Sequence, residues 1–112
     1  MKHLFFMLMM MITLFPTKTF AKDEATKTSF IVYGNCETCK KKIEKAAKVD
    51  GVKSAVWSDK TKIITVSFLP SKISLDQIEK NIANVGYDTD KYKGDDNAYK
   101  KLPQCCQYER KK

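Results

Sequence analysis

Histidine and methionine are missing from most of this sequence. The one histidine and all five methionines lie in the first 21 residues. Soft metal ions in proteins are bound by sulfur or imidazole, so a site for such an ion in residues 22–112 has to be built mainly from thiolates. The four cysteines that could supply them are Cys36, Cys39, Cys105 and Cys106.

The opening segment itself has the pattern of a secretory signal. A charged start precedes an apolar run over residues 4–15, which ends at Pro16. This run is shorter than the roughly 20 residues of a membrane-spanning helix. Thr19 and Ala21 supply the small residues of a cleavage site. We predict cleavage after Ala21 and export to the periplasm or the medium, with an uncleaved membrane anchor as the alternative.

Arginine is also scarce, since Arg110 is the only one in the chain. Lysine dominates the formal net charge of +8, which becomes +6 once Lys2 and Lys18 of the opening segment are removed. Proteins that bind nucleic acid by charge usually gather arginine and lysine on one face. The absence of an arginine cluster, together with export, disfavours nucleic acid as a partner.

Two segments show the periodicity of amphipathic helices. Cys39, Ile43 and Ala47 fall on one helical face while lysines face elsewhere, which predicts a helix over residues 39–48. The second segment begins with Ser74 and Gln77 at the spacing of a capping box. It predicts a helix that ends before the glycine at position 86.

Other segments are rich in β-branched and aromatic residues, as strands are. We expect strands at residues 28–34, 52–57 and 62–68, and a short fourth strand at 88–92. With the helices, the order is strand, helix, strand, strand, helix, strand. This order predicts an α+β fold, the ferredoxin-like βαββαβ sandwich, in which a four-stranded antiparallel sheet carries two helices on one face.

Cys36 and Cys39 lie where the first expected helix begins. The positive end of the helix dipole and the following lysines lower the pKa of a thiol from about 8.5, and we expect the stronger effect at Cys39. A thiolate is both a redox nucleophile and a ligand for Cu(I) and zinc. The chemistry therefore leaves metal binding and thiol–disulfide exchange open. A disulfide is a third state in an oxidising compartment, although so short a loop gains little stability from one.

Several segments together resemble the heavy-metal-associated domain. They are "VYGNCETC", "KKKIEKAAKVDGVKSAVW", "KIITVSF" and "IEKNIANVGYD", and the resemblance runs from Ser29 to about Tyr92. The family includes small copper chaperones, the N-terminal domains of copper-transporting P-type ATPases and the periplasmic mercury-binding protein. Most members have a methionine two residues before the first cysteine, where this chain has Gly34.

The resemblance implies a non-enzymatic protein that binds a soft cation through Cys36 and Cys39. The cation is typically Cu(I), which passes to a similar cysteine pair of a partner by ligand exchange; Hg(II) and Zn(II) are the other candidates. Tyr87 is implied as the residue that closes over the metal loop. We therefore predict a monomeric, exported metallochaperone or scavenger whose partner is a metal-transporting membrane protein or another metal-binding domain. A thiol–disulfide oxidoreductase or redox sensor is the alternative.

The domain organisation follows from the same boundaries. We expect a signal peptide at residues 1–21, a short linker at 22–27, the heavy-metal-associated domain at 28–92 and a polar tail at 93–112. The lysines that follow Cys39 could guide docking onto an acidic partner surface, or could simply form a solvated helix face.

The tail contains adjacent cysteines, Cys105 and Cys106. They could complete a four-thiolate site with Cys36 and Cys39, cap a bound ion or pair with the loop cysteines when no metal is bound. They could also be exchangeable thiols on an exposed tail. Four cysteines allow three pairings, and the sequence does not choose among them.

Overall fold

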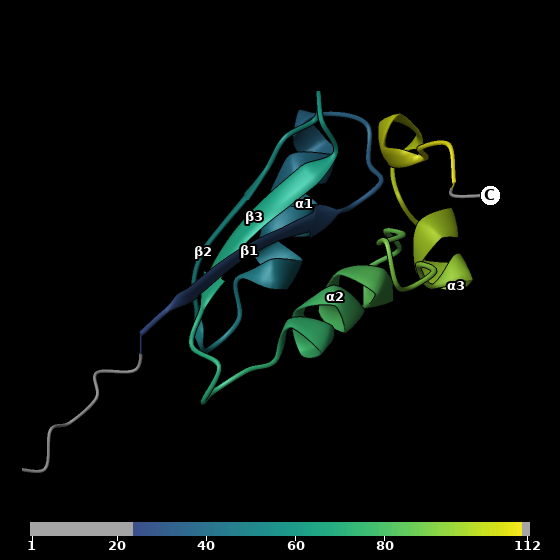
Figure 1. The fold of residues 1–112 in the computed structure, drawn as a ribbon. Helices are drawn as coiled ribbons and strands as arrows, with labels where there is room; N and C mark the ends of the chain where they lie inside the picture. Colours follow the sequence, from purple (N-terminus) through teal and green to yellow (C-terminus); the bar gives the residue numbers. More distant parts are fainter. Residues whose placement is uncertain (1–23, 111–112) are drawn as a thin grey trace, which may run out of the picture.

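A computed structural model describes residues 24–110 (Figure 1), and the predicted signal peptide lies outside this part. The elements in chain order are β1 (Thr26–Ile31), α1 (Glu37–Ala47), β2 (Val52–Trp57), β3 (Ile63–Phe68), α2 (Leu75–Asn84), α3 (Asp96–Lys100) and the 3-10 turn η1 (Gln104–Cys106). None of the helices in residues 24–110 has the length and apolar character needed to cross a membrane.

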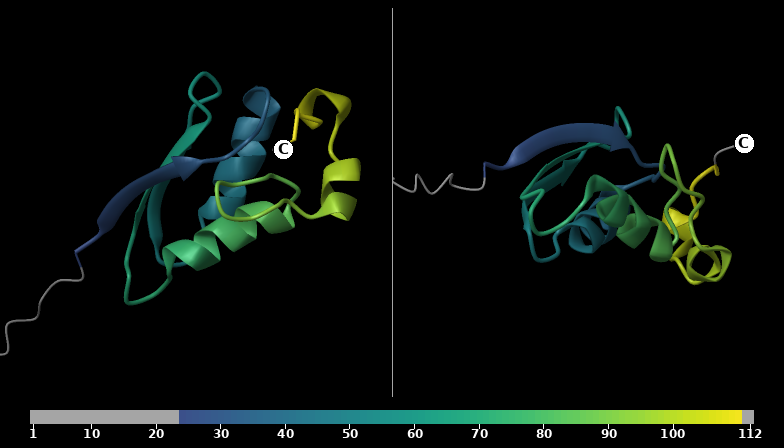
Figure 2. Two further views of the ribbon diagram at one scale, coloured as in Figure 1. Left: turned by 45° about the vertical axis from the view of Figure 1, so that its right-hand side comes forward. Right: turned by 60° about the horizontal axis from the view of Figure 1, so that its bottom comes forward.

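The three strands form one sheet in the order β1-β3-β2, and β3 is antiparallel to both neighbours. Along β3, which confirms the strand expected at residues 62–68, every second residue is buried: Ile64, Val66 and Phe68. Helices α1 and α2 both cover the same face of the sheet (Figure 2). The core therefore lies between the sheet and these two helices, as the predicted α+β class requires.

Both main helices begin as their sequences predict. Helix α1 follows Cys36, whose extended backbone (φ −141°, ψ 179°) makes it the N-cap, and it buries Cys39 along its apolar face. At the start of α2 the Ser74 hydroxyl accepts a hydrogen bond from the backbone amide of Gln77 at 3.1 Å. The reciprocal half of the capping box is replaced, since the Gln77 side chain donates to Asn81 at 2.9 Å.

The fourth strand expected at residues 88–92 is not confirmed. In the described part of the chain this segment makes a single antiparallel bridge to the first strand, between Val32 and Thr89. The chain then turns, because the Thr89 hydroxyl accepts hydrogen bonds from the backbone amides of Lys91 and Tyr92 at 3.3 and 2.9 Å. A local side-chain bond thus competes successfully with the sheet ladder.

The C-terminal segment folds back beside the start of α1 (Figure 2). Leu102, Cys106 and Tyr108 are buried there and join the core. Gly86, after α2, permits this packing: its φ is 104°, and a side chain on it would lie 2.8 Å from the backbone nitrogen of Tyr99. The segment expected to be a polar tail thus covers the loop between β1 and α1.

Candidate metal centre

Cys36, the N-cap of α1, and Cys39, in the first turn of that helix, lie close together but in different surroundings. Their Sγ atoms are 3.7 Å apart. Cys36, at the N-cap, is partly exposed, whereas Cys39 is completely buried because it belongs to the apolar face of the helix. The loop therefore presents one accessible and one enclosed sulfur at the same place.

The C-terminal segment brings a third sulfur to this pair. The Sγ atoms of Cys36, Cys39 and Cys106 all lie within 4.8 Å of one another, and Cys106 is completely buried. Cys105 is exposed; its Sγ lies 3.9 Å from that of Cys106, and its backbone oxygen accepts from the Cys36 thiol at 3.5 Å and the Cys39 thiol at 4.0 Å. Of the four candidate ligands, the structure thus gathers three sulfurs.

Hydrogen bonding around the N-cap makes the Cys36 thiol acidic. The backbone amide of Cys39 is the main cause, and together with the Cys39 thiol it lowers the pKa of Cys36 from an ordinary 9.0 to about 7. Amides at a helix start stabilise a thiolate because their dipoles point toward it. An acidic thiol is thus present at the N-cap itself, and the effect expected at Cys39 stays a prediction.

Tyr87 lies three residues after the end of α2, next to the Cys39 and Cys106 thiols. Its side chain is completely buried and stacks on Tyr108, with ring centroids 5.7 Å apart. Burial, and after it the neighbouring Cys39 thiol, raises the pKa of the Tyr87 hydroxyl well above its usual range. Tyr87 therefore remains a neutral phenol next to the sulfurs, and loop closure stays its predicted role.

A set of polar contacts holds the C-terminal segment in this position, and sequence reasoning missed it. The Tyr108 hydroxyl donates to the Gly86 carbonyl and accepts from the Asp88 amide, both at 2.7 Å. The Arg110 guanidinium pairs with the buried Asp88 carboxylate at 2.8 Å and with Asp96 at 2.6 Å. Only the rarity of arginine in the sequence pointed to Arg110. We call Tyr108 and Arg110 with these partners the C-terminal clasp.

The glycine in place of the usual family methionine has a structural reason. A Cβ on Gly34 would lie 3.0 Å from Ile43 and 3.1 Å from the Trp57 ring. The Trp57 indole is buried, and its N–H donates to the Val32 carbonyl at 3.0 Å. Trp57 thus fills the space beneath the metal loop, and a longer side chain at position 34 would collide with it.

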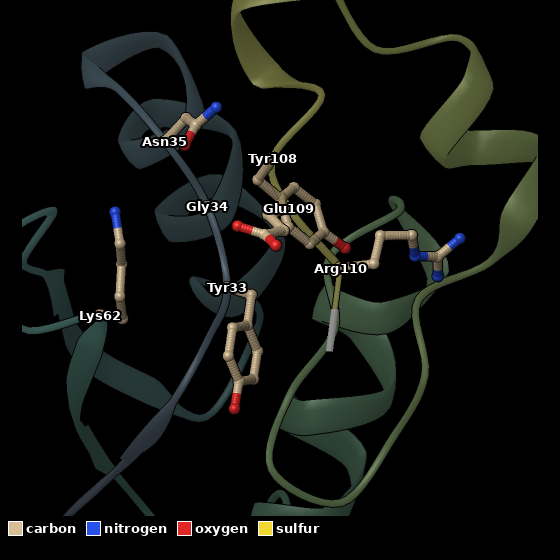
Figure 3. A pocket seen from close by; sticks show the side chains of 7 residues that line it. All are labelled: Tyr33, Gly34, Asn35, Lys62, Tyr108, Glu109 and Arg110. Atoms are coloured by element: carbon tan, nitrogen blue, oxygen red, sulfur yellow. The ribbon is translucent and has the colours of Figure 1, made fainter. Parts of the chain in front are cut away.

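A groove of about 540 Å³ lies between residues 33–35 and Lys62 on one side and residues 108–110 on the other. Figure 3 shows Tyr33, Asn35 and Lys62 on one side of this groove and Tyr108, Glu109 and Arg110 on the other; the Glu109 carboxylate points toward the groove, and the Arg110 side chain points away from it. The lining includes Asn35, which directly precedes Cys36 along the chain.

The chemistry of this donor set fits a soft cation. Sulfur ligands select Cu(I) and zinc, whereas magnesium and calcium require oxygen ligands. The three gathered ligand atoms are all thiol sulfur. The site therefore suits a thiophilic ion carried as cargo.

Comparisons with known proteins point the same way. A family model described as "Heavy-metal-associated domain" matches residues 34–88, a range that contains Cys36, Cys39 and Tyr87 and ends before Cys106. A search of curated protein sequences gives no significant match.

Solved structures are also similar to this chain. A structure titled CopZ metallochaperone shares 30% identity over 57% of this chain and 98% of its own, with a TM-score of 0.55. The Cu(I)-loaded N-terminal domain of a potential copper-translocating P-type ATPase from Bacillus subtilis shares 27% sequence identity. The match covers 58% of this chain and 84% of that domain, with a TM-score of 0.55. The N-terminal domain of the zinc(II) ATPase ZiaA shares 31% sequence identity; the match covers 58% of this chain and 63% of that chain, with a TM-score of 0.51.

Proposed function

Because this chain belongs to the heavy-metal-associated domain family, we propose that it is an exported carrier of Cu(I) that holds the ion through Cys36 and Cys39. The observation that supports this most directly is the approach of these two sulfurs to 3.7 Å at the start of α1. A thiolate accessible near neutral pH binds a soft ion without a large cost of deprotonation, and the Cys36 pKa of about 7 provides one.

Copper is preferred to zinc because of the number of ligands. Structural zinc is almost always held by four ligands in a tetrahedron, whereas three sulfurs meet here. By their titles, one of the similar structures is a Cu(I)-loaded domain of a potential copper-translocating ATPase, one is a metallochaperone and one is a domain of a zinc(II) ATPase. Zn(II) and Hg(II) therefore remain the competing cargoes to be measured beside Cu(I).

Transfer to a partner follows from the exposure of the site. Cys36 is partly exposed, so an incoming thiolate can reach the ion and displace its ligands one at a time. One similar structure is a domain of a copper-translocating ATPase, and a metal-transporting membrane protein of this kind, or another metal-binding domain, is the partner we propose. Lys41 and Lys42 lie exposed beside the loop and would favour an acidic surface.

Titration of the reduced protein with Cu(I) in competition with a chromophoric chelator tests this function. We expect about one ion per chain, and we expect the double substitution Cys36→Ser/Cys39→Ser to abolish tight binding because the remaining thiols are then too few. Cys105→Ser is the matched control, since it removes an exposed thiol. Unchanged affinity in the double variant would refute the proposal.

Thiol–disulfide exchange is the second candidate function. The lowered pKa of the partly exposed Cys36, with Cys39 at 3.7 Å to resolve a mixed disulfide, is the observation that favours it. Catalytic reduction of a protein disulfide, measured beside the Cu(I) titration, separates the two. Turnover without tight metal binding would favour the redox function.

A further inference from the structure

The third sulfur of the cluster lies outside the residues that match the family, which end at position 88. We propose that Cys106 is a third thiolate ligand of the bound ion, and that the C-terminal segment thereby controls how readily the ion leaves. This inference rests on the proposed function, because it assigns a further ligand to the same site.

The distances between the sulfurs suit a three-coordinate ion. Thiolates at about 2.3 Å from a metal ion in a planar three-fold arrangement lie about 4 Å from one another. The Cys36 and Cys39 sulfurs are already 3.7 Å apart, and Cys106 completes a triangle with no side longer than 4.8 Å. Binding therefore needs the sulfurs to move by less than an ångström.

The position of Cys106 is fixed before any ion arrives. Its backbone amide donates to the Pro103 carbonyl at 2.7 Å, within the turn η1. Two residues later the Tyr108 hydroxyl is bonded to Gly86 and Asp88, and the Tyr108 carbonyl accepts from the Tyr99 hydroxyl at 2.8 Å. Because folding has already ordered this segment, binding a third ligand loses little further conformational entropy.

Protons leave the site as the ion enters. Each thiol releases one proton to solvent when its sulfur becomes a thiolate ligand. The Cys36 and Cys39 thiols then no longer donate to the Cys105 carbonyl, as they do in this structure at 3.5 and 4.0 Å. Loss of these two weak bonds leaves the turn free to make the small approach that brings the Cys106 sulfur to the ion.

A third ligand changes the route by which the ion departs. With two ligands, both on the loop, an incoming thiolate can bind the open side of the ion directly. With Cys106 bound, that side is occupied by a residue of the C-terminal segment, so transfer requires Cys106 to dissociate. The C-terminal clasp, which holds Cys106 in place, then favours retention of the ion over release.

X-ray absorption on the Cu(I)-loaded, reduced protein counts the sulfur ligands directly, in a buffer with a phosphine reductant so that no added thiol can bind. We expect three sulfurs in the unaltered protein and in Cys105→Ala, and two in Cys106→Ala. We also expect Cys106→Ala to lose at least about tenfold in Cu(I) affinity, because changing a residue that only supports a ligand already costs about 10- to 100-fold. The variant should also release the ion faster to a chelator. Cys105→Ala is the matched control because it is the neighbouring residue and is exposed.

Two sulfurs in the unaltered protein would overturn this inference even if Cys106→Ala failed to fold. Equal sulfur number and affinity in Cys106→Ala and the unaltered protein would also overturn it. Neither result affects the proposed function, which fails if Cys36→Ser/Cys39→Ser still binds Cu(I) tightly or if the unaltered protein does not bind it tightly. The two proposals can therefore fail separately.

Discussion

At the scale of single residues, Cys36 and Cys39 have unequal parts to play although both belong to one short loop. Cys36 is the N-cap of α1 and is partly exposed, while Cys39 is enclosed by the core. In the proposed exchange, a partner therefore reaches Cys36 first, and Cys39 is the ligand that the ion keeps longest. This inequality is a property of the helix start and does not depend on which ion is bound.

The Cys36 thiol of the metal-free, reduced protein should react with an alkylating agent over an unusually low pH range. Its pKa of about 7 in the folded protein, against an ordinary 9.0, means that the thiolate fraction rises through neutral pH. The rate at this residue, followed against pH by mass spectrometry of its peptide, should have its midpoint near 7 and move upward in urea. The same midpoint in folded and unfolded protein would show that the N-cap geometry is not formed.

Arg110 should contribute strongly to stability because its partner Asp88 is completely buried. Removing one member of a buried ion pair typically costs about 3 kcal/mol or more, and we expect this loss for Arg110→Gln. Lys93→Gln is the control, since it breaks an exposed pair with Asp96 that contributes at most about 1 kcal/mol. Urea unfolding measures both, and equal losses would contradict the C-terminal clasp.

The sequence could predict that Cys36 and Cys39 lie together at a helix start, but not the residues that surround them. Cys36 and Cys39 are defined by local spacing, and their helix start follows from the apolar face that Cys39 begins. The approach of Cys106 depends on contacts such as that of Tyr108 with Gly86, across 22 positions. Long-range pairs of this kind leave no periodic signal in a single sequence, which is why the tail cysteines stayed an open question.

At the scale of elements, the strands and helices that were predicted correctly have a buried face with a regular period. The alternation of Ile64, Val66 and Phe68 defined β3, and the Ser74 cap defined the start of α2. The fourth strand is not confirmed, because the Thr89 hydroxyl accepts hydrogen bonds from the backbone amides of Lys91 and Tyr92 and the chain turns there. Whether a threonine hydroxyl forms such local hydrogen bonds cannot be predicted from the composition of the segment.

Helix α2 should carry a pH-dependent contribution to stability through Glu79. This carboxyl is buried, near Asp90 and Asp76 and 3.8 Å from the Lys91 ammonium. Burial, with Asp90 next, raises its pKa from 4.5 to about 8. Because the folded state holds the proton more tightly, the contribution is complete below about pH 4.5 and is lost as the pH rises through about 8.

The variant Glu79→Gln should remove this dependence, since its amide cannot ionise. Urea midpoints of both proteins at about pH 5 and about pH 9 give the comparison. The difference in stability between variant and unaltered protein should shift in favour of the variant at the higher pH. A constant difference would mean that Glu79 titrates alike in the folded and unfolded states.

At the scale of the whole molecule, the family match and the hydrophobic core have different extents. The match ends at residue 88, while the core continues through Leu102, Cys106 and Tyr108. These three residues pack against a fold that similar proteins complete in fewer residues, since the CopZ structure is covered to 98% of its length by 57% of this chain. The C-terminal segment therefore packs against the loop between β1 and α1 and extends the core beyond the residues that match the family.

Deleting residues 95–112 tests whether this segment is part of the folding unit. Burial of a large apolar side chain contributes about 1.5 to 3 kcal/mol, and both Leu102 and Tyr108 would be lost. We expect the shortened chain to unfold with a free energy lower by about 3 kcal/mol, since the entropy of ordering the segment offsets part of the gain. Deletion of residues 111–112 alone serves as the control. Equal midpoints for all three chains would place the domain boundary before residue 95, as the sequence analysis expects.

The packing of Trp57 beneath Gly34 also gives the protein an optical property. Trp57 is the only tryptophan in the chain, and its ring lies 3.1 Å from the position of a Cβ on Gly34, two residues before Cys36. Indole emission responds to nearby heavy ions by quenching and to a stiffer or drier environment by a shift in wavelength. The tryptophan fluorescence of the unlabelled protein therefore reports on the surroundings of Trp57 beneath this loop, with no second indole to contribute to the signal.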